Sequence, residues 1–238
     1  MVVSILRDSS YTWPERVMML LAFLVAIYFA IVLHEVAHGL VALWNGDPTA
    51  KYNRRLTLNP VRHIDPIGAV MMLFVGIGWA KPVPVDPRNF KNFKRGMVTV
   101  SLAGVCTNLI LAFVSFGMYV AMGAIARNVQ QTSQAGYLVL FLFTYLFLYS
   151  TVLNISLIAF NLLPIAPLDG FRLVESFTRP NNGYVRFMYR YGRYIFLVLI
   201  ALGVLADTTG LPCDVLGMYI SAVQRGILTL FNLIFGVG

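Results

Sequence analysis

The chain has 238 residues, of which 58% are hydrophobic and 12% are charged, and its formal net charge is +8. Soluble domains carry about 25% charged residues, so this composition excludes an ordinary soluble fold and indicates an integral membrane protein. The basic excess does not indicate nucleic-acid binding, because Lys and Arg of membrane proteins collect in cytoplasmic loops. We therefore expect one membrane domain over residues 1–238, embedded in a lipid bilayer, with no nucleic acid as a partner.

About 20 apolar residues cross the core of a bilayer. By this rule the chain is expected to be an all-α polytopic membrane protein with about five transmembrane helices. These helices are expected near residues 15–45, 97–126, 136–163, 190–206 and 215–236. Thr12 can cap the first of them, Pro14 suits its first turn, and the Gly46-Asp47-Pro48 sequence ends it.

The first expected helix contains a His-Glu-x-x-His pattern, formed by His34, Glu35 and His38. On a helix this spacing puts two imidazoles one turn apart on one face, where both can bind a single Zn²⁺. Glu35 borders the same face and can take a proton from a zinc-bound water. Ionisable groups in a membrane-spanning helix are costly, so we interpret the pattern as a hydrolytic metal site at membrane depth.

The segment 51–95 has a different character. It is rich in Pro, Gly, Lys and Arg, yet it holds an apolar stretch over 67–79 that is too short to span. We expect a re-entrant or β-like element, since non-helical backbone survives at that depth only when it is buried or lines a wet cavity. Residues 70–86 are expected to hold an unwound substrate as an added strand, although prolines limit pairing on one side. The expected substrate contacts are Gly76, Gly78 and Trp79.

The third expected helix is interrupted by Pro164 and Pro167. A catalytic zinc normally has three protein ligands and a water. The acids at the depth of the two histidines are Glu35 and Asp169, and Glu35 is needed as the base. Asp169 is therefore the expected third ligand. His63 is expected to be a surface or turn residue, because a fourth ligand would expel the water.

The distribution of Lys and Arg predicts the topology. Nine lie in 51–95 and five in 164–193, which puts 14 on one side, against Arg7, Arg16 and Arg127 on the other. The positive-inside rule places the 14 in the cytoplasm. The N-terminus is then outside, the C-terminus is inside, and the metal site faces the cytoplasmic side of the cell membrane.

Several motifs together resemble the site-2 protease family of intramembrane zinc metalloproteases, over roughly residues 17–175. They are His-Glu-Val-Ala-His-Gly at 34–39, Leu-Asn-Pro at 58–60, His-Ile-Asp-Pro-Ile-Gly at 63–68, Gly-Trp-Ala-Lys-Pro-Val-Pro-Val at 78–85, Gly-x-x-x-Asn at 104–108, and Asn-Leu-Leu-Pro-Ile-Ala-Pro-Leu-Asp-Gly at 161–170. Two positions depart from the family pattern: Ala166 replaces a frequent proline and Asp86 a frequent asparagine. The resemblance marks about 15–175 as the catalytic core and 184–238 as additional C-terminal helices.

The resemblance implies one Zn²⁺ per chain, bound by His34, His38 and Asp169, with Glu35 as the base. It also implies a membrane-protein substrate with a single transmembrane helix, cut in or near that helix in regulated intramembrane proteolysis. For Asn108 it implies a role in orienting the substrate carbonyl or oxyanion, whereas the residue type alone equally fits an interhelical hydrogen bond. Many members carry a PDZ or CBS domain. This chain resembles the short, minimal branch, so a regulatory membrane partner is expected.

Three other interpretations remain open at this point. A metalloprotease of another type would use Glu175, the downstream glutamate, as the third ligand. A membrane metal-binding or transport protein would carry the metal without hydrolysis, although a transporter is expected to show more than one ligand cluster along its path. A nonenzymatic scaffold would not need an intact Glu35.

Overall fold

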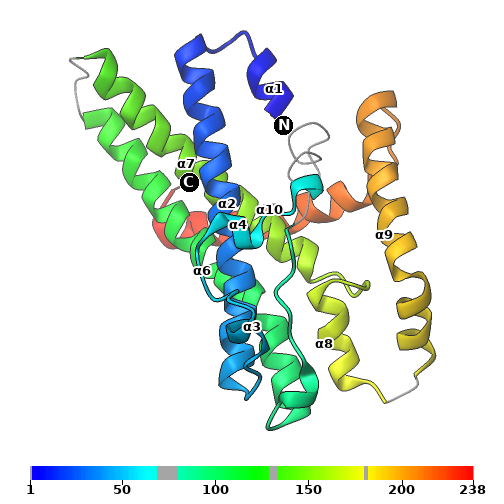
Figure 1. The fold of residues 1–238 in the computed structure, drawn as a ribbon. Coiled ribbons are helices and arrows are strands. Elements are labelled where there is room, and N and C mark those ends of the chain that lie inside the picture. Colours follow the sequence, from blue (N-terminus) through cyan, green and yellow to red (C-terminus); the bar gives the residue numbers. More distant parts are fainter. Residues whose placement is uncertain (1, 69–79, 129–132, 180–181, 238) are drawn as a thin grey trace.

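The computed structural model describes residues 2–68, 80–128, 133–179 and 182–237 (Figure 1). Its elements are α1 (Val2–Arg7), α2 (Trp13–Trp44), α3 (Thr49–Tyr52), α4 (Pro60–His63), the 3₁₀ turn η1 (Pro87–Asn89), α6 (Phe93–Asn128), α7 (Gln134–Asn161), α8 (Asp169–Phe177), α9 (Gly183–Thr209) and α10 (Val215–Phe235). In the described part of the chain, α2, α6, α7, α9 and α10 are long and apolar enough to cross a membrane. The expected all-α polytopic membrane fold is confirmed.

Helix α2 packs against α6 and α7 through one row of its surface. The row repeats every four residues, which on a helix places side chains on one face. Its members are all buried: Ala22, Ala26, Ala30, His34, His38 and Ala42. Small residues let neighbouring helices approach closely in a membrane, where apolar burial alone gives no driving force. The two histidines therefore lie in a closely packed interface of α2 with its neighbours.

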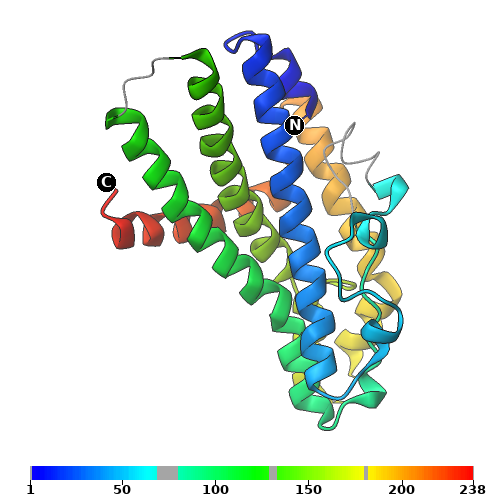
Figure 2. The same ribbon diagram turned by 60° about the vertical axis from the view of Figure 1, so that its left-hand side comes forward.

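The ends of α2 are set by local chemistry. At the start, the Glu15 carboxylate accepts a hydrogen bond from the Thr12 backbone N–H at 2.7 Å, as in a capping box. At the other end, Gly46 takes φ of +106°, a backbone conformation that is strained for residues with a side chain. The chain then turns back, and α3 and α4 run beside α2 (Figure 2). The expected helix limits of 15–45 are thus close to the observed ones.

The segment after α2 is less regular than a strand pair. Within the described residues it contains short helical turns and an isolated antiparallel bridge between Ile64 and Ala80. The Lys81 N–H donates to the His63 carbonyl at 2.8 Å beside that bridge. The expected substrate-contact residues Gly76, Gly78 and Trp79 lie outside the described residues, so their role stays a prediction.

Helices α9 and α10 are arranged differently from the first three long helices. In both views α10 runs across the long axes of α2 and α6 rather than alongside them (Figures 1 and 2). Its Phe231 is buried in a cluster with Phe116 of α6 and Ile155 of α7. Length and apolar composition predict that a segment is helical, whereas this aromatic packing decides its direction. The placement of the C-terminus inside the cell stays a prediction.

Candidate metal centre

Helix α2 delivers two imidazoles to the same point. His34 and His38 are each 7% exposed, and their Nε2 atoms lie 3.0 Å apart. The His34 ring lies directly against α6 at Gly104, where any Cβ would overlap the imidazole. Glycine at position 104 is therefore a packing requirement of the metal site, and the Gly-x-x-x-Asn motif serves this contact with its first residue.

Asp169 reaches the histidines because α7 ends before it. Helix α7 stops at Asn161, and α8 begins at Asp169 after a turn that contains Pro164 and Pro167. Gly170 follows, and a Cβ there would overlap the Leu162 carbonyl, so the turn is too tight for a larger residue. Asp169 Oδ2 lies 3.3 Å from His34 Nε2 and 3.1 Å from His38 Nε2. The predicted ligand set is thus brought together by a helix break.

Hydrogen bonds on the far side of each ring determine which nitrogen faces the cluster. His38 Nδ1 lies 2.7 Å from the Val100 carbonyl oxygen, which can only accept, so Nδ1 carries the proton. His34 Nδ1 lies 2.5 Å from Asn108 Oδ1. In the neutral rings both Nε2 atoms then present lone pairs to each other and to Asp169.

The amide orientation of Asn108 follows from its other partners. Asn154 Nδ2 donates to the Ser150 carbonyl at 2.7 Å, which turns Asn154 Oδ1 toward Asn108. Asn108 Nδ2 then donates to Asn154 Oδ1 at 2.7 Å, and its own oxygen must face His34. Both asparagines are at most 1% exposed. The chain of hydrogen bonds from α7 through α6 therefore fixes the His34 tautomer.

These residues fit a zinc ion. Two Nε2 lone pairs and the Asp169 Oδ2 atom lie within 4.8 Å of one another, and Oδ2 is buried without a hydrogen bond. Three acceptors that face each other in a buried site repel unless a cation lies between them. Two imidazoles and one carboxylate form the donor set of catalytic zinc sites.

Glu35 lies next to the cluster and has one oxygen already engaged. Its Oε2 accepts a hydrogen bond from the Val83 backbone N–H at 2.7 Å. Val83 belongs to the proline-rich 80–86 segment, so this segment orients the carboxylate. No described residue donates a hydrogen bond to Oε1, so this oxygen is available to the attacking water.

The other candidate residues lie elsewhere. Glu175 accepts a hydrogen bond from the Tyr189 hydroxyl at 2.7 Å and is not part of the ligand cluster in the described chain. His63 is not part of it either, but the expectation that it lies on the surface is wrong. It is 1% exposed, and its Nε2 lies 2.7 Å from the Thr57 carbonyl. The sequence carries no signal for that burial, since it depends on how the segment after α2 folds back.

Asn108, which the family resemblance associates with the substrate, is fully buried behind His34. In this structure it contacts a metal ligand, and its two amide atoms are occupied. The contacts of Val83 with Glu35, of Val100 with His38 and of Asn154 with Asn108 were not predicted. The first two use backbone atoms, which any residue type provides, so no sequence signal could have identified them.

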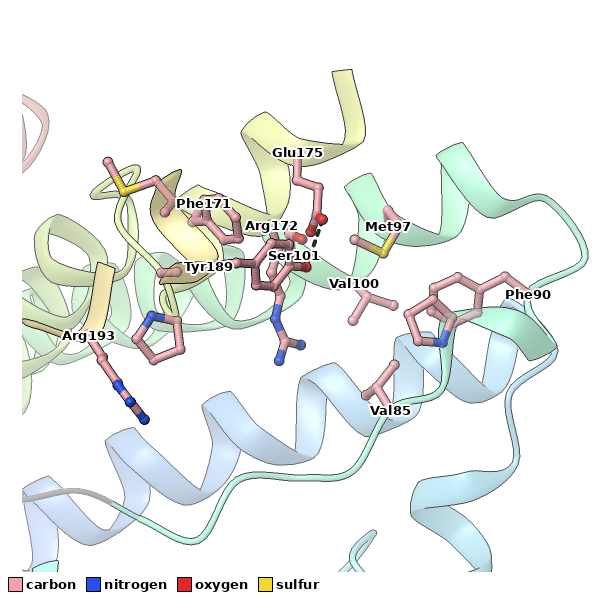
Figure 3. A pocket seen from close by; sticks show the side chains of 14 residues that line it. Val85, Phe90, Met97, Val100, Ser101, Phe171, Arg172, Glu175, Tyr189 and Arg193 are labelled. Carbon is pink, nitrogen blue, oxygen red and sulfur yellow. Dashed lines mark hydrogen bonds between the residues drawn. The ribbon is translucent and has the colours of Figure 1, made fainter. Parts of the chain in front are cut away.

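A cavity of about 460 Å³ adjoins the metal centre (Figure 3). Three of the segments that hold the site contribute a wall residue: Val85 follows Val83 by two positions, Val100 provides the carbonyl on His38, and Phe171 follows Asp169 by two positions. Phe90 and Met97 add apolar surface, and the Glu175–Tyr189 hydrogen bond closes the wall between α8 and α9 (Figure 3).

We predict that Asn108→Ala weakens zinc binding by about 10- to 100-fold, the usual cost of removing a partner of a metal-bound histidine. Without its acceptor, the His34 ring can turn or change tautomer. Zinc affinity is measured by competition with a chromogenic chelator. Thr144→Val is the matched control, since it removes an interaction within α7, from Thr144 Oγ1 to the Leu140 carbonyl. Equal affinity of Asn108→Ala and the wild-type chain would contradict a positioning role.

Comparison with known proteins also indicates a zinc metalloprotease. The family model "Peptidase family M50" matches residues 122–200. "Putative zinc metalloprotease YwhC" of Bacillus subtilis (strain 168) is 39% identical over 212 residues, which cover 89% of this chain and 91% of that protein. "Putative zinc metalloprotease Rip2" of Mycolicibacterium smegmatis is 27% identical over 158 residues, covering 64% and 56%. "Zinc metalloprotease MJ0392" of Methanocaldococcus jannaschii is 24% identical over 214 residues, covering 89% and 51%. No solved structure matches the chain.

Proposed function

Since the chain belongs to peptidase family M50 and is a zinc metalloprotease, we propose that it hydrolyses a peptide bond of its substrate within the membrane. The observation that carries this proposal is the position of the ligands. Two of them lie in the buried face of α2, a helix with the length and hydropathy of a membrane span, and the third follows directly after α7, another such helix. A bond that reaches these ligands must itself lie at or near membrane depth.

The residues divide the chemistry among them. A zinc ion held by His34, His38 and Asp169 would lower the pKa of a water to about 7 and polarise the scissile carbonyl. Glu35 accepts the proton of the attacking water at Oε1 and delivers it to the leaving amine. The Val83 N–H holds the other carboxylate oxygen, so Glu35 keeps its orientation through both steps.

The cavity beside the metal centre is the proposed site for substrate side chains next to the scissile bond. Its apolar wall residues suit the side chains of a transmembrane helix. The substrate is proposed to be a membrane protein with a single transmembrane helix that unwinds locally, because a helix engages its carbonyls in its own hydrogen bonds. Docking on residues 70–86, the absence of a nucleic-acid partner and a regulatory membrane partner remain part of the proposal.

Reconstituted cleavage tests the proposed function. The purified chain in liposomes, mixed with single-span peptides, is expected to produce fragments whose new ends lie within the span, as mapped by mass spectrometry. A zinc chelator is expected to stop the reaction, and added zinc to restore it. A chain that binds zinc but cuts no peptide would support the metal-binding or transport alternative. Cuts confined to soluble loops would contradict intramembrane cleavage.

The active site is proposed to face the cytoplasm. The support is the Lys and Arg distribution, together with the position of the end of α2, the start of α6 and α8 at one end of the bundle (Figure 1). In a chain without Cys106 and Cys213, we expect Lys91→Cys to be protected from an impermeant maleimide in intact cells. We expect Gln134→Cys to be labelled. The reverse labelling pattern would invert the topology.

A further inference from the structure

A second cavity, of about 660 Å³, lies away from the metal centre between the segment after α2 and the start of the proline-rich segment. Its lining includes three cationic side chains and two neutral amides, and no acidic residue. The lining residues are Asn53, Arg55, Asn59, Val61, Arg62, Lys81, Pro82 and Pro84. A concave surface that combines cations and amide donors without a carboxylate is complementary to an anion.

Arg55 is the central observation, because it is a buried cation that forms no direct ion pair within the described residues. Its side chain is 6% exposed, and it forms no ion pair with a described residue. One terminal nitrogen donates to the Lys81 carbonyl, and Nε has no hydrogen-bond partner. Burial lowers the pKa of Arg55, Glu35 acts against that change, and Arg62 adds to it. Buried charges are normally paired and hydrogen-bonded, and the partnerless Nε leaves this guanidinium able to bind a further negative group.

The segment around the cavity combines exposed apolar side chains with the cations. Near the middle of α2, the Tyr28 hydroxyl donates to the Leu58 carbonyl, and apolar side chains of residues 58–67 are exposed. They are Leu58 at 50%, Val61 at 82%, Ile64 at 46% and Ile67 at 68%. Further along α2, Leu56 packs at Gly39, at the level of the buried Arg55. Exposed apolar side chains thus lie beside the cations of the cavity, so acyl chains can pack on the former while a headgroup binds the latter.

We propose that this cavity binds the phosphate of an anionic phospholipid headgroup, with Arg55, Arg62 and Lys81 as its cationic partners. The amides of Asn53 and Asn59 provide neutral donors. Basic pockets at the cytoplasmic side of membrane helices suit such headgroups. The proposal does not depend on proteolytic activity, because it is argued from a cavity that contains no metal ligand.

Occupation of the cavity would reach the catalytic base through the backbone. Arg55 holds the Lys81 carbonyl, and Val83, two residues further on, holds Glu35. A phosphate on the guanidinium reduces the cost of keeping that cation buried, and so favours the arrangement in which Lys81 and Val83 are fixed. Anionic lipid is therefore expected to stabilise the folded chain even when cleavage is not measured.

Lipid binding to the full zinc-loaded chain is the test. In neutral detergent, dioleoylphosphatidylglycerol is titrated while the Tm is recorded, and native mass spectrometry counts the bound lipids. The wild-type chain is expected to gain stability and retain one lipid. The double variant Arg62→Gln/Lys81→Gln, at exposed positions, is expected to need at least about tenfold more lipid, since each cation near a headgroup contributes on the order of one decade.

Three comparisons make the result decisive. The matched control Lys91→Gln/Arg95→Gln removes the same charge from exposed positions outside the cavity and is expected to behave like the wild-type chain. An equal loss in both double variants would overturn the proposal, because it would indicate general electrostatics. Inorganic phosphate that stabilises at the same concentrations would overturn the lipid source. Phosphatidylcholine, whose headgroup is neutral overall, is expected to stabilise less, and equal stabilisation would also overturn the proposal.

Discussion

Glu35→Gln is expected to retain its zinc and to lose peptide hydrolysis by about 10²- to 10⁴-fold, the usual contribution of a general base. The amide has nearly the same shape as the carboxylate. Its oxygen can still accept the Val83 N–H hydrogen bond that orients Glu35, so the side chain keeps its place. What then faces the water is an NH₂ group, which has no lone pair to take a proton.

Two measurements on the same Glu35→Gln preparation separate chemistry from structure. Elemental analysis is expected to give the wild-type zinc content, and the reconstituted assay is expected to show the loss of rate. A lost rate with lost zinc would mean that Glu35 supports the metal site rather than the proton transfer. A near wild-type rate with full zinc would show that another group is the base.

Asp169→Ala is expected to lose most of the bound zinc. The site then has two imidazoles in place of three ligands, and zinc sites depend on at least three protein donors. Loss of affinity should exceed the roughly 10- to 100-fold expected for a supporting residue such as Asn108. Chelator competition measures the zinc affinity, and elemental analysis measures the zinc content. The helices are expected to stay folded in this variant, since Asp169 lies in the first turn of α8 and outside the long spans.

Glu175→Ala is the matched control for this result. It removes a carboxylate from the same helix, but one that is bonded to Tyr189 instead of directed at the histidines. This variant is expected to keep its zinc. The opposite pair of outcomes, with full zinc in Asp169→Ala and zinc loss in Glu175→Ala, would favour the other class of metalloprotease.

Much of the site was predictable because its information is local. The His-Glu-x-x-His spacing puts His34 and His38 on one helix face in any context, and the helix limits follow from apolar length and end signals. Asp169 was predicted from residue chemistry and depth, since few acids are available in so apolar a chain. The predicted ligand set is the cluster that the structure brings together.

Other features depend on contacts between residues far apart in the chain, so no local pattern could indicate them. His63 is buried because the segment after α2 folds back on itself. Helix α10 lies across the bundle, where its Phe231 packs against Phe116 of α6. The proton on His34 Nδ1 depends on Asn108 and Asn154, which come from two other helices. Spacing along one helix thus identifies the ligands, while their orientation, and that of the base at Val83, arises only when separate segments pack together.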